Sequence, residues 1–65
     1  MKITAEYHGA HGSCGYYTGI VYILTATFSL MNEIIIHRQD GDGMCIYSTL
    51  NAFLSNWRDV NKLEK

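Results

Sequence analysis

The chain has 65 residues, of which 48% are hydrophobic and only 17% are charged, and its net charge is −1. This length gives one domain, residues 1–65, which is small for the scaffold that catalysis needs, so we expect a binding protein with no cofactor and not an enzyme. The weak net charge argues against duplex nucleic acid as a partner. The charged share lies below the usual value of roughly 25%, which predicts a homo-oligomer or another buried partner interface.

The N-terminal sequence predicts neither export nor membrane insertion. Residues 1–6 lack the apolar core of a signal peptide, and no later run approaches the ~18 apolar residues of a membrane span. We therefore expect a cytoplasmic protein that does not bind membranes. In that reducing compartment Cys14 and Cys45 are expected to be free thiols that pack as small apolar side chains.

The first half of the chain predicts strands on either side of a glycine-rich loop. Polar and apolar residues alternate over residues 2–8, which is the period of a half-buried strand. Residues 9–15 are rich in glycine and form the loop. β-branched and aromatic residues dominate residues 16–30 and predict one long or bent strand, with Gly19 as a bulge.

The middle of the chain predicts two further strands joined by a hairpin turn. Residues 31–33 form a tight turn, residues 34–38 a strand with one strongly apolar side, and residues 44–47 a short strand. The D-G-D-G sequence of residues 40–43 reverses the chain between these strands, because Asp-Gly pairs tolerate the positive φ that hairpin turns require.

After the hairpin, the apolar period changes from that of a strand to that of a helix. Four apolar side chains fall on one helical face: Leu50, Phe53, Leu54 and Trp57. Ser48 is the expected N-cap, and residues 60–63 are expected to add an edge strand or to fray. This order of elements predicts a β-rich α+β domain with one short C-terminal helix, built on either a small antiparallel sheet or an SH3-like barrel.

Three potential metal ligands lie close together in the first part of the chain. His8, His11 and Cys14 have the spacing H-x2-H-x2-C, and Cys45 or His37 would complete four ligands for zinc. Structural zinc sites usually carry paired ligands at two ends of the chain, which this sequence lacks. We therefore interpret the segment as a solvated polar loop and predict no metal.

Tyrosines on both sides of the glycine-rich loop suggest a nucleotide site. Tyrosine rings stack on bases, glycine backbone forms anion-binding nests, and an arginine guanidinium forks onto a phosphate. The alternative is that the tyrosines are half-buried strand residues and that the glycines only make turns. The predicted ligand-binding residues are Tyr7, His11, Ser13, Gly15, Tyr16, Tyr17, Thr18 and Arg38.

A second aromatic group lies in the C-terminal part of the chain. Tyr47, Phe53 and Trp57 are the predicted contacts to a partner protein, because buried aromatic anchors dominate protein interfaces. For Phe53 and Trp57 the alternative is a place in the core between the helix and the sheet.

Two stretches resemble a pattern found in a group of very small proteins encoded by bacteriophages. Residues 13–24 read SCGYYTGIVYIL and residues 46–57 read IYSTLNAFLSNW. In the phage proteins G-Y-x-T-G-x-x-Y-x-L precedes Y-x-S-L-x-x-F-L-x-N-W, and here Thr49 replaces the usual serine. The resemblance covers 24 residues and implies an accessory protein of the anti-defence type, which acts stoichiometrically on a host system.

Three functions follow as hypotheses. The first is a protein in the host cytoplasm that binds and sequesters a nucleotide immune signal, of the cyclic or ADP-ribose type, without cleaving it. The second is a protein-protein inhibitor of a host defence effector such as a CRISPR nuclease. The third is a structural or regulatory phage component that has no ligand.

Overall fold

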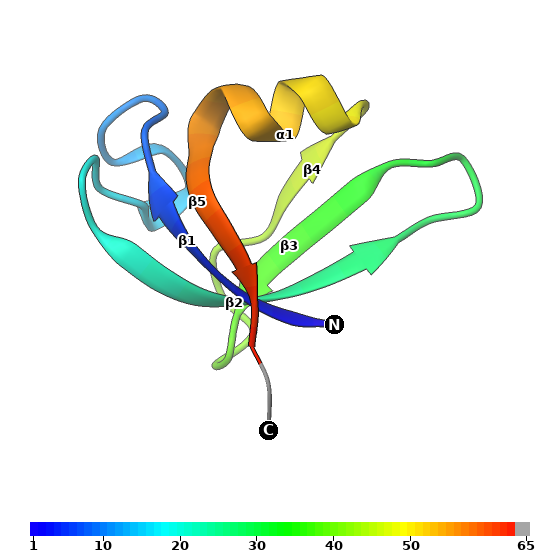
Figure 1. Ribbon diagram of the computed structural model, residues 1–65, viewed down its shortest axis with the longest axis horizontal. Coiled ribbons are helices and arrows are strands. Elements are labelled where there is room, and N and C mark those ends of the chain that lie inside the picture. The colour runs from blue at the N-terminus through cyan, green and yellow to red at the C-terminus, as the bar shows by residue number, and fades with distance from the viewer. Residues whose placement is uncertain (64–65) are drawn as a thin grey trace.

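The computed structural model describes residues 1–63, which form one antiparallel sheet and one short helix (Figure 1). The elements are β1 Lys2–Tyr7, η1 Ser13–Gly15 (a 3-10 turn), β2 Val21–Phe28, β3 Ile34–Arg38, β4 Cys45–Tyr47, α1 Leu50–Asn56 and β5 Trp57–Lys62. The strand order is β4-β3-β2-β1-β5, with every neighbouring pair antiparallel. Because β4 and β5 form the two edges, the sheet is open. The structure thus confirms the predicted class, and of the two predicted architectures it has the antiparallel sheet.

The sheet curves around α1, which lies across its concave face (Figure 1). Alternation along each strand directs every second side chain to that face, as the sequence predicts for residues 2–8. Side chains from β1, β2, β3, β5 and α1, and one from the loop before β2, form a single core. Its buried residues are Ile3, Ala5, Tyr7, Tyr16, Leu24, Ala26, Ile34, Ile36, Phe53 and Trp57.

Trp57 is the centre of an aromatic cluster in this core. The centroid of its ring lies 4.9 Å from that of Tyr7, 5.0 Å from that of Tyr16 and 6.2 Å from that of Phe53. Its indole N–H donates a hydrogen bond to the Tyr47 hydroxyl at 3.0 Å. Aromatic pairs at such separations contribute about 0.5–1.5 kcal/mol each beyond apolar burial. The cluster therefore joins the loop, the sheet and the helix.

β2 is shorter than the sequence predicts, and the difference lies at its start. The prediction is one strand over residues 16–30, whereas β2 begins at Val21. Gly19 has a φ of 89°, and its N–H donates to the Tyr7 carbonyl at 2.8 Å. It therefore belongs to a turn before the strand and is not a bulge within it. Tyr16 is left outside the sheet and enters the core from the loop.

The helix has different ends from those predicted. Thr49, and not Ser48, is the N-cap, because its Oγ1 accepts a hydrogen bond from the Ala52 N–H at 3.0 Å. Trp57 has an extended φ of −132° and is the first residue of β5, so it packs from a strand. The edge strand predicted at residues 60–63 is present, but it begins earlier, at Trp57.

Both predicted turns are confirmed. Over residues 40–43 the Asp42 carbonyl accepts a hydrogen bond from the Arg38 N–H at 2.8 Å. Around residues 31–33 the Ser29 hydroxyl oxygen accepts hydrogen bonds from two backbone N–H groups, at 3.1 and 3.2 Å. These turns place β3 between β2 and β4 in the sheet.

Candidate functional site

Two residues predicted to stack on a nucleotide base, Tyr7 and Tyr16, lie in the core. They are 2% and 0% exposed, and their hydroxyl groups donate to the carbonyls of Ala10 at 2.9 Å and Gly43 at 2.7 Å. Burial raises the pKa of Tyr7 and raises the pKa of Tyr16 to about 12, against the opposing effect of Arg38. The predicted stacking role is therefore wrong for these two rings, which pack on other core aromatics instead.

Three other predicted ligand residues form a cluster on the surface of the glycine-rich loop. The His11 Nδ1 accepts a hydrogen bond from the Thr18 N–H at 3.2 Å, and the Thr18 hydroxyl donates to the Gly9 carbonyl at 3.1 Å. The His11 ring lies edge-on to the Tyr17 ring at 5.0 Å. These contacts hold the two strands of the loop together, and the exposed Tyr17 ring is the one predicted stacking group of the loop on the surface.

Arg38 lies against the Tyr16 ring and connects the glycine-rich loop to the turn of residues 40–43. Its guanidinium carbon is 5.1 Å from the centroid of the Tyr16 ring, and its Nη1 is 3.5 Å from the Gly15 carbonyl oxygen. Its Nε is 4.0 Å from the Asp40 carboxylate. Arg38 and Gly15, which were predicted to belong to one site, therefore do lie next to each other. The Arg38 guanidinium, however, covers the Tyr16 ring and contacts the Asp40 carboxylate.

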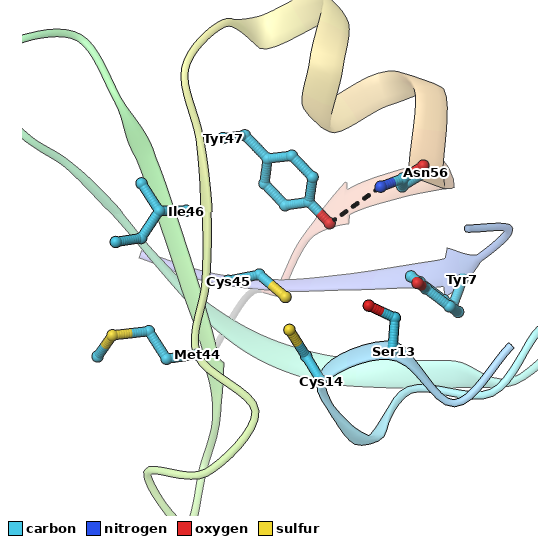
Figure 2. A pocket seen from close by; sticks show the side chains of 8 residues that line it. All are labelled: Tyr7, Ser13, Cys14, Met44, Cys45, Ile46, Tyr47 and Asn56. Carbon is cyan, nitrogen blue, oxygen red and sulfur yellow. Dashed lines mark hydrogen bonds between the residues drawn. The ribbon is translucent and has the colours of Figure 1, made fainter. Parts of the chain in front are cut away.

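A hollow without charged side chains lies between η1, β4 and the end of α1, and we call it the loop hollow (Figure 2). Its volume is about 420 Å³, within the range of small-molecule sites. The Tyr47 hydroxyl at its wall accepts hydrogen bonds from Trp57 at 3.0 Å and from the Asn56 amide at 3.4 Å. The lining residues are Tyr7, Ser13, Cys14, Met44, Cys45, Ile46, Tyr47 and Asn56.

Two thiols face each other across the loop hollow. Both are free, as the sequence predicts. Cys14 is exposed, so its predicted packing as a small apolar side chain is wrong, whereas Cys45 is half-buried. Burial, with a smaller contribution from the neighbouring Cys14 thiol, raises the pKa of the Cys45 thiol to about 12. The sequence brought Cys14 and Cys45 together only as an alternative set of zinc ligands, and neither is among the predicted ligand-binding residues. The two cysteines are far apart in the chain, and only the strand register shows that they meet.

The histidine and cysteine spacing does not assemble a metal site. The His8 Nε2 lies 3.0 Å from the Glu6 carboxylate, so this side chain turns toward its own strand. Among residues 1–63 no three His, Cys, Asp or Glu side chains gather closely enough to hold a metal ion.

A second candidate surface lies at the other end of the concave face, and we call it the apolar groove. Its volume is about 140 Å³, and all nine of its lining residues are apolar. Four of them form the buried floor: Ile3, Ala26, Ile34 and Phe53. The other five form an exposed rim: Met1, Phe28, Leu50, Leu54 and Val60. The helical apolar period at Leu50 and Leu54 is the sequence signal for this rim, because the sheet covers only part of that helical face.

The residues predicted to contact a partner are mostly inside the protein. Phe53 is 4% and Trp57 is 1% exposed, so both belong to the core, and the predicted interface is wrong at these positions. Tyr47 is half-buried and lines the loop hollow. The exposed apolar residues lie around the groove instead, together with Leu30 and Met31 at the turn between β2 and β3.

Comparison with known proteins adds no relative to this description. No protein family, no curated protein and no solved structure matches the chain. None of the helical structure in residues 1–63 is long and apolar enough to cross a membrane. The function is therefore argued from the loop hollow and the apolar groove.

Proposed function

We propose that the protein is a non-enzymatic inhibitor that docks its apolar groove on a host defence protein. The observation that carries this proposal is the uncovered end of the core, where five apolar rim residues surround a floor with no polar group. Apolar surface that is contiguous and hollowed is typical of protein interaction sites. The type of partner comes from the resemblance to phage anti-defence proteins.

The size of the domain is consistent with this mode of action. A standard interface takes about 800 Å² from each partner, which is roughly a fifth of the 4299 Å² of accessible surface of this chain. The groove and the apolar turn beside it supply the dry centre that such an interface needs. The complementary partner is a protein surface with projecting apolar side chains.

The thiols of the loop hollow do not argue for catalysis. A cysteine nucleophile needs a base within hydrogen-bonding reach and an orienting group behind it. The residues that line the loop hollow include no histidine and no carboxylate. We therefore assign the protein a binding function.

The test compares a charge substitution on the rim of the apolar groove with one on the opposite side of the sheet. Leu54 on the groove rim is 46% exposed, and Ile23 of β2, which points away from the core, is 43% exposed. Leu54→Lys and Ile23→Lys therefore each replace a branched apolar side chain by lysine at similar exposure. Binding is measured by calorimetry against a panel of purified bacterial immune effectors that includes a CRISPR nuclease.

The expected result is that wild type and Ile23→Lys bind one effector equally, while Leu54→Lys weakens binding at least tenfold. Equal weakening by both substitutions would rule out the groove as the docking surface. Failure of the wild type to bind any effector in the panel would count against the inhibitor function itself. A homo-oligomer that uses the same groove stays a prediction, which sedimentation of the wild type and of Leu54→Lys tests.

Nucleotide sequestration is the second candidate, and the loop hollow favours it. The hollow has the volume for a small ligand, and the Ser13 hydroxyl and the Asn56 amide line it. It contains no arginine or lysine, so a ligand here would be recognised mainly through its base or ribose. Sequestration without cleavage remains the mode of action in this case.

This candidate is tested by incubation with cyclic and ADP-ribose-type nucleotides, removal of unbound material, heat denaturation and mass spectrometry. Recovery of an intact nucleotide would support sequestration. Asn56→Ala should then reduce the recovered amount, whereas Asn51→Ala, the same change on the exposed side of the same helix, should not. If no nucleotide is recovered from the wild type, the candidate is rejected.

A further inference from the structure

The pair of thiols in the loop hollow has no part in the proposed docking. Figure 2 shows the sulfur of Cys14, which comes from η1, and the sulfur of Cys45, which comes from β4, directed toward each other. Both side chains line the loop hollow. Both are free, so this arrangement is a reduced dithiol.

The backbone of the loop places Cys14 in this position. Its φ is 54°, a left-handed conformation that is uncommon for a residue with a side chain. Gly12 and Gly15, which also have positive φ, lie on either side of it and allow the tight turn. The same glycines allow the loop backbone to adjust when a bond forms between the two facing sulfurs.

The two thiols differ in their access to solvent. Cys14 is exposed, so a small oxidant in solution reaches it first, whereas Cys45 is half-buried behind it. Thiolates and not thiols react with oxidants, and burial keeps the Cys45 thiol protonated at neutral pH by raising its pKa to about 12. This asymmetry assigns Cys14 the first reaction and Cys45 the second.

We propose that Cys14 and Cys45 are an oxidative modification site, at which a hydroperoxide converts the facing thiols into a reversible intramolecular disulfide. In the first step the Cys14 thiolate attacks the hydroperoxide. The O–O bond breaks, Cys14 becomes a sulfenic acid, and the leaving oxygen takes a proton to become water or an alcohol.

In the second step the Cys45 sulfur attacks the Cys14 sulfur. The S–O bond breaks, and the hydroxide leaves as water with the proton of the Cys45 thiol. Overall the two thiols lose two electrons and two protons, and the hydroperoxide is reduced. The new bond ties the glycine-rich loop to the edge strand β4 across the loop hollow, and it leaves the apolar groove unchanged.

The test treats the full chain with a small excess of hydrogen peroxide and follows intact mass and free thiols. The expected product has lost two hydrogens, has gained no oxygen at either cysteine, contains a Cys14 to Cys45 link in its peptide map, and returns to the dithiol with dithiothreitol. Because folding holds the sulfurs together for the second step, the ratio of disulfide to oxidised single cysteines should be about tenfold higher in buffer than in concentrated guanidinium chloride.

Two variants test the order of the steps, after circular dichroism has shown that they fold. Cys14→Ser, which changes an exposed side chain, should leave Cys45 unoxidised under the same treatment. Cys45→Ser should leave Cys14 to gain oxygen atoms, because the second sulfur is missing. If Cys45→Ser does not fold, the Cys14→Ser result and the product ratio decide. Oxygen gain at Cys14 or Cys45 in the wild type, a disulfide between two chains, or equal product ratios in buffer and guanidinium chloride would overturn the proposal.

Discussion

The two ends of the concave face are covered in opposite ways. At one end the glycine-rich loop folds over the sheet and buries Tyr16 completely. At the other end no segment within residues 1–63 covers α1, and Leu50 and Leu54 stay 58% and 46% exposed although they belong to the apolar face of the helix. The same sheet thus carries a closed end that stabilises the fold and an open end that is available to a partner.

The largest expected effect comes from removing the centre of the closed end. Trp57→Ala deletes a 1% exposed ring and leaves the Tyr47 hydroxyl without its indole donor. We expect it to lower the free energy of unfolding by about 3–5 kcal/mol, which is most of the stability of so small a domain. Urea unfolding followed by circular dichroism measures the loss, because Trp57 is the only tryptophan and fluorescence disappears with it.

Leu54→Ala is the matching change at the open end. Leu54 is 46% exposed, so we expect the free energy of unfolding to change by no more than about 0.5 kcal/mol. If Leu54→Ala and Trp57→Ala destabilised the protein to a similar extent, the open end would be part of the folding core, and the contrast between the two ends would be lost.

Alkaline pH should weaken the closed end selectively, because the two groups with strongly raised pKa values lie there. The pKa rises from 9.0 to about 12 for Cys45 and from 10.0 to about 12 for Tyr16, mainly through burial. Folding therefore favours the protonated forms. Their contribution to stability is fully present below about pH 9 and is lost as the pH rises toward about 12.

The urea midpoint should therefore fall over that range of pH. Cys45→Ala should make the urea midpoint fall less at the lower end of this pH range. There the thiol of the unfolded chain ionises before its tyrosine does, because their ordinary pKa values are 9.0 and 10.0. A variant whose midpoint falls as steeply as that of the wild type from pH 9 upward would show that Cys45 does not contribute to the pH dependence.

The open end was easier to predict from sequence than the closed end. The alternation in residues 2–8 and the helical period at Leu50 and Leu54 are local patterns, and they correctly identify strand, helix and apolar face. Tyr16 is buried because its ring packs on Trp57 and its hydroxyl donates to the Gly43 carbonyl, both distant in the chain, and no local period contains that information. The β-branched and aromatic composition of residues 16–30 therefore predicts one strand, although residues 16–20 precede β2.

The candidate sites follow the same division. The glycine-rich loop was correctly identified as a loop, but the fold separates its predicted ligand residues among the core, the loop surface and the side of the Arg38 guanidinium. The facing of Cys14 and Cys45 depends on where β4 lies in the sheet, which pattern alone does not give. Long-range register, and not residue type, decided which groups meet.

The most local expected effect concerns the helix start beside the apolar groove. Thr49→Ala removes the hydroxyl oxygen that accepts the Ala52 N–H at 3.0 Å, so the free energy of unfolding should fall by about 1 kcal/mol. Ser48→Ala, one residue earlier and without a capping bond, should leave it nearly unchanged. If the alanine at Ser48 were the more costly of the two, the helix would begin one residue earlier than it does here. The orientation of Leu50 toward the groove would then change, and with it the shape of the open end.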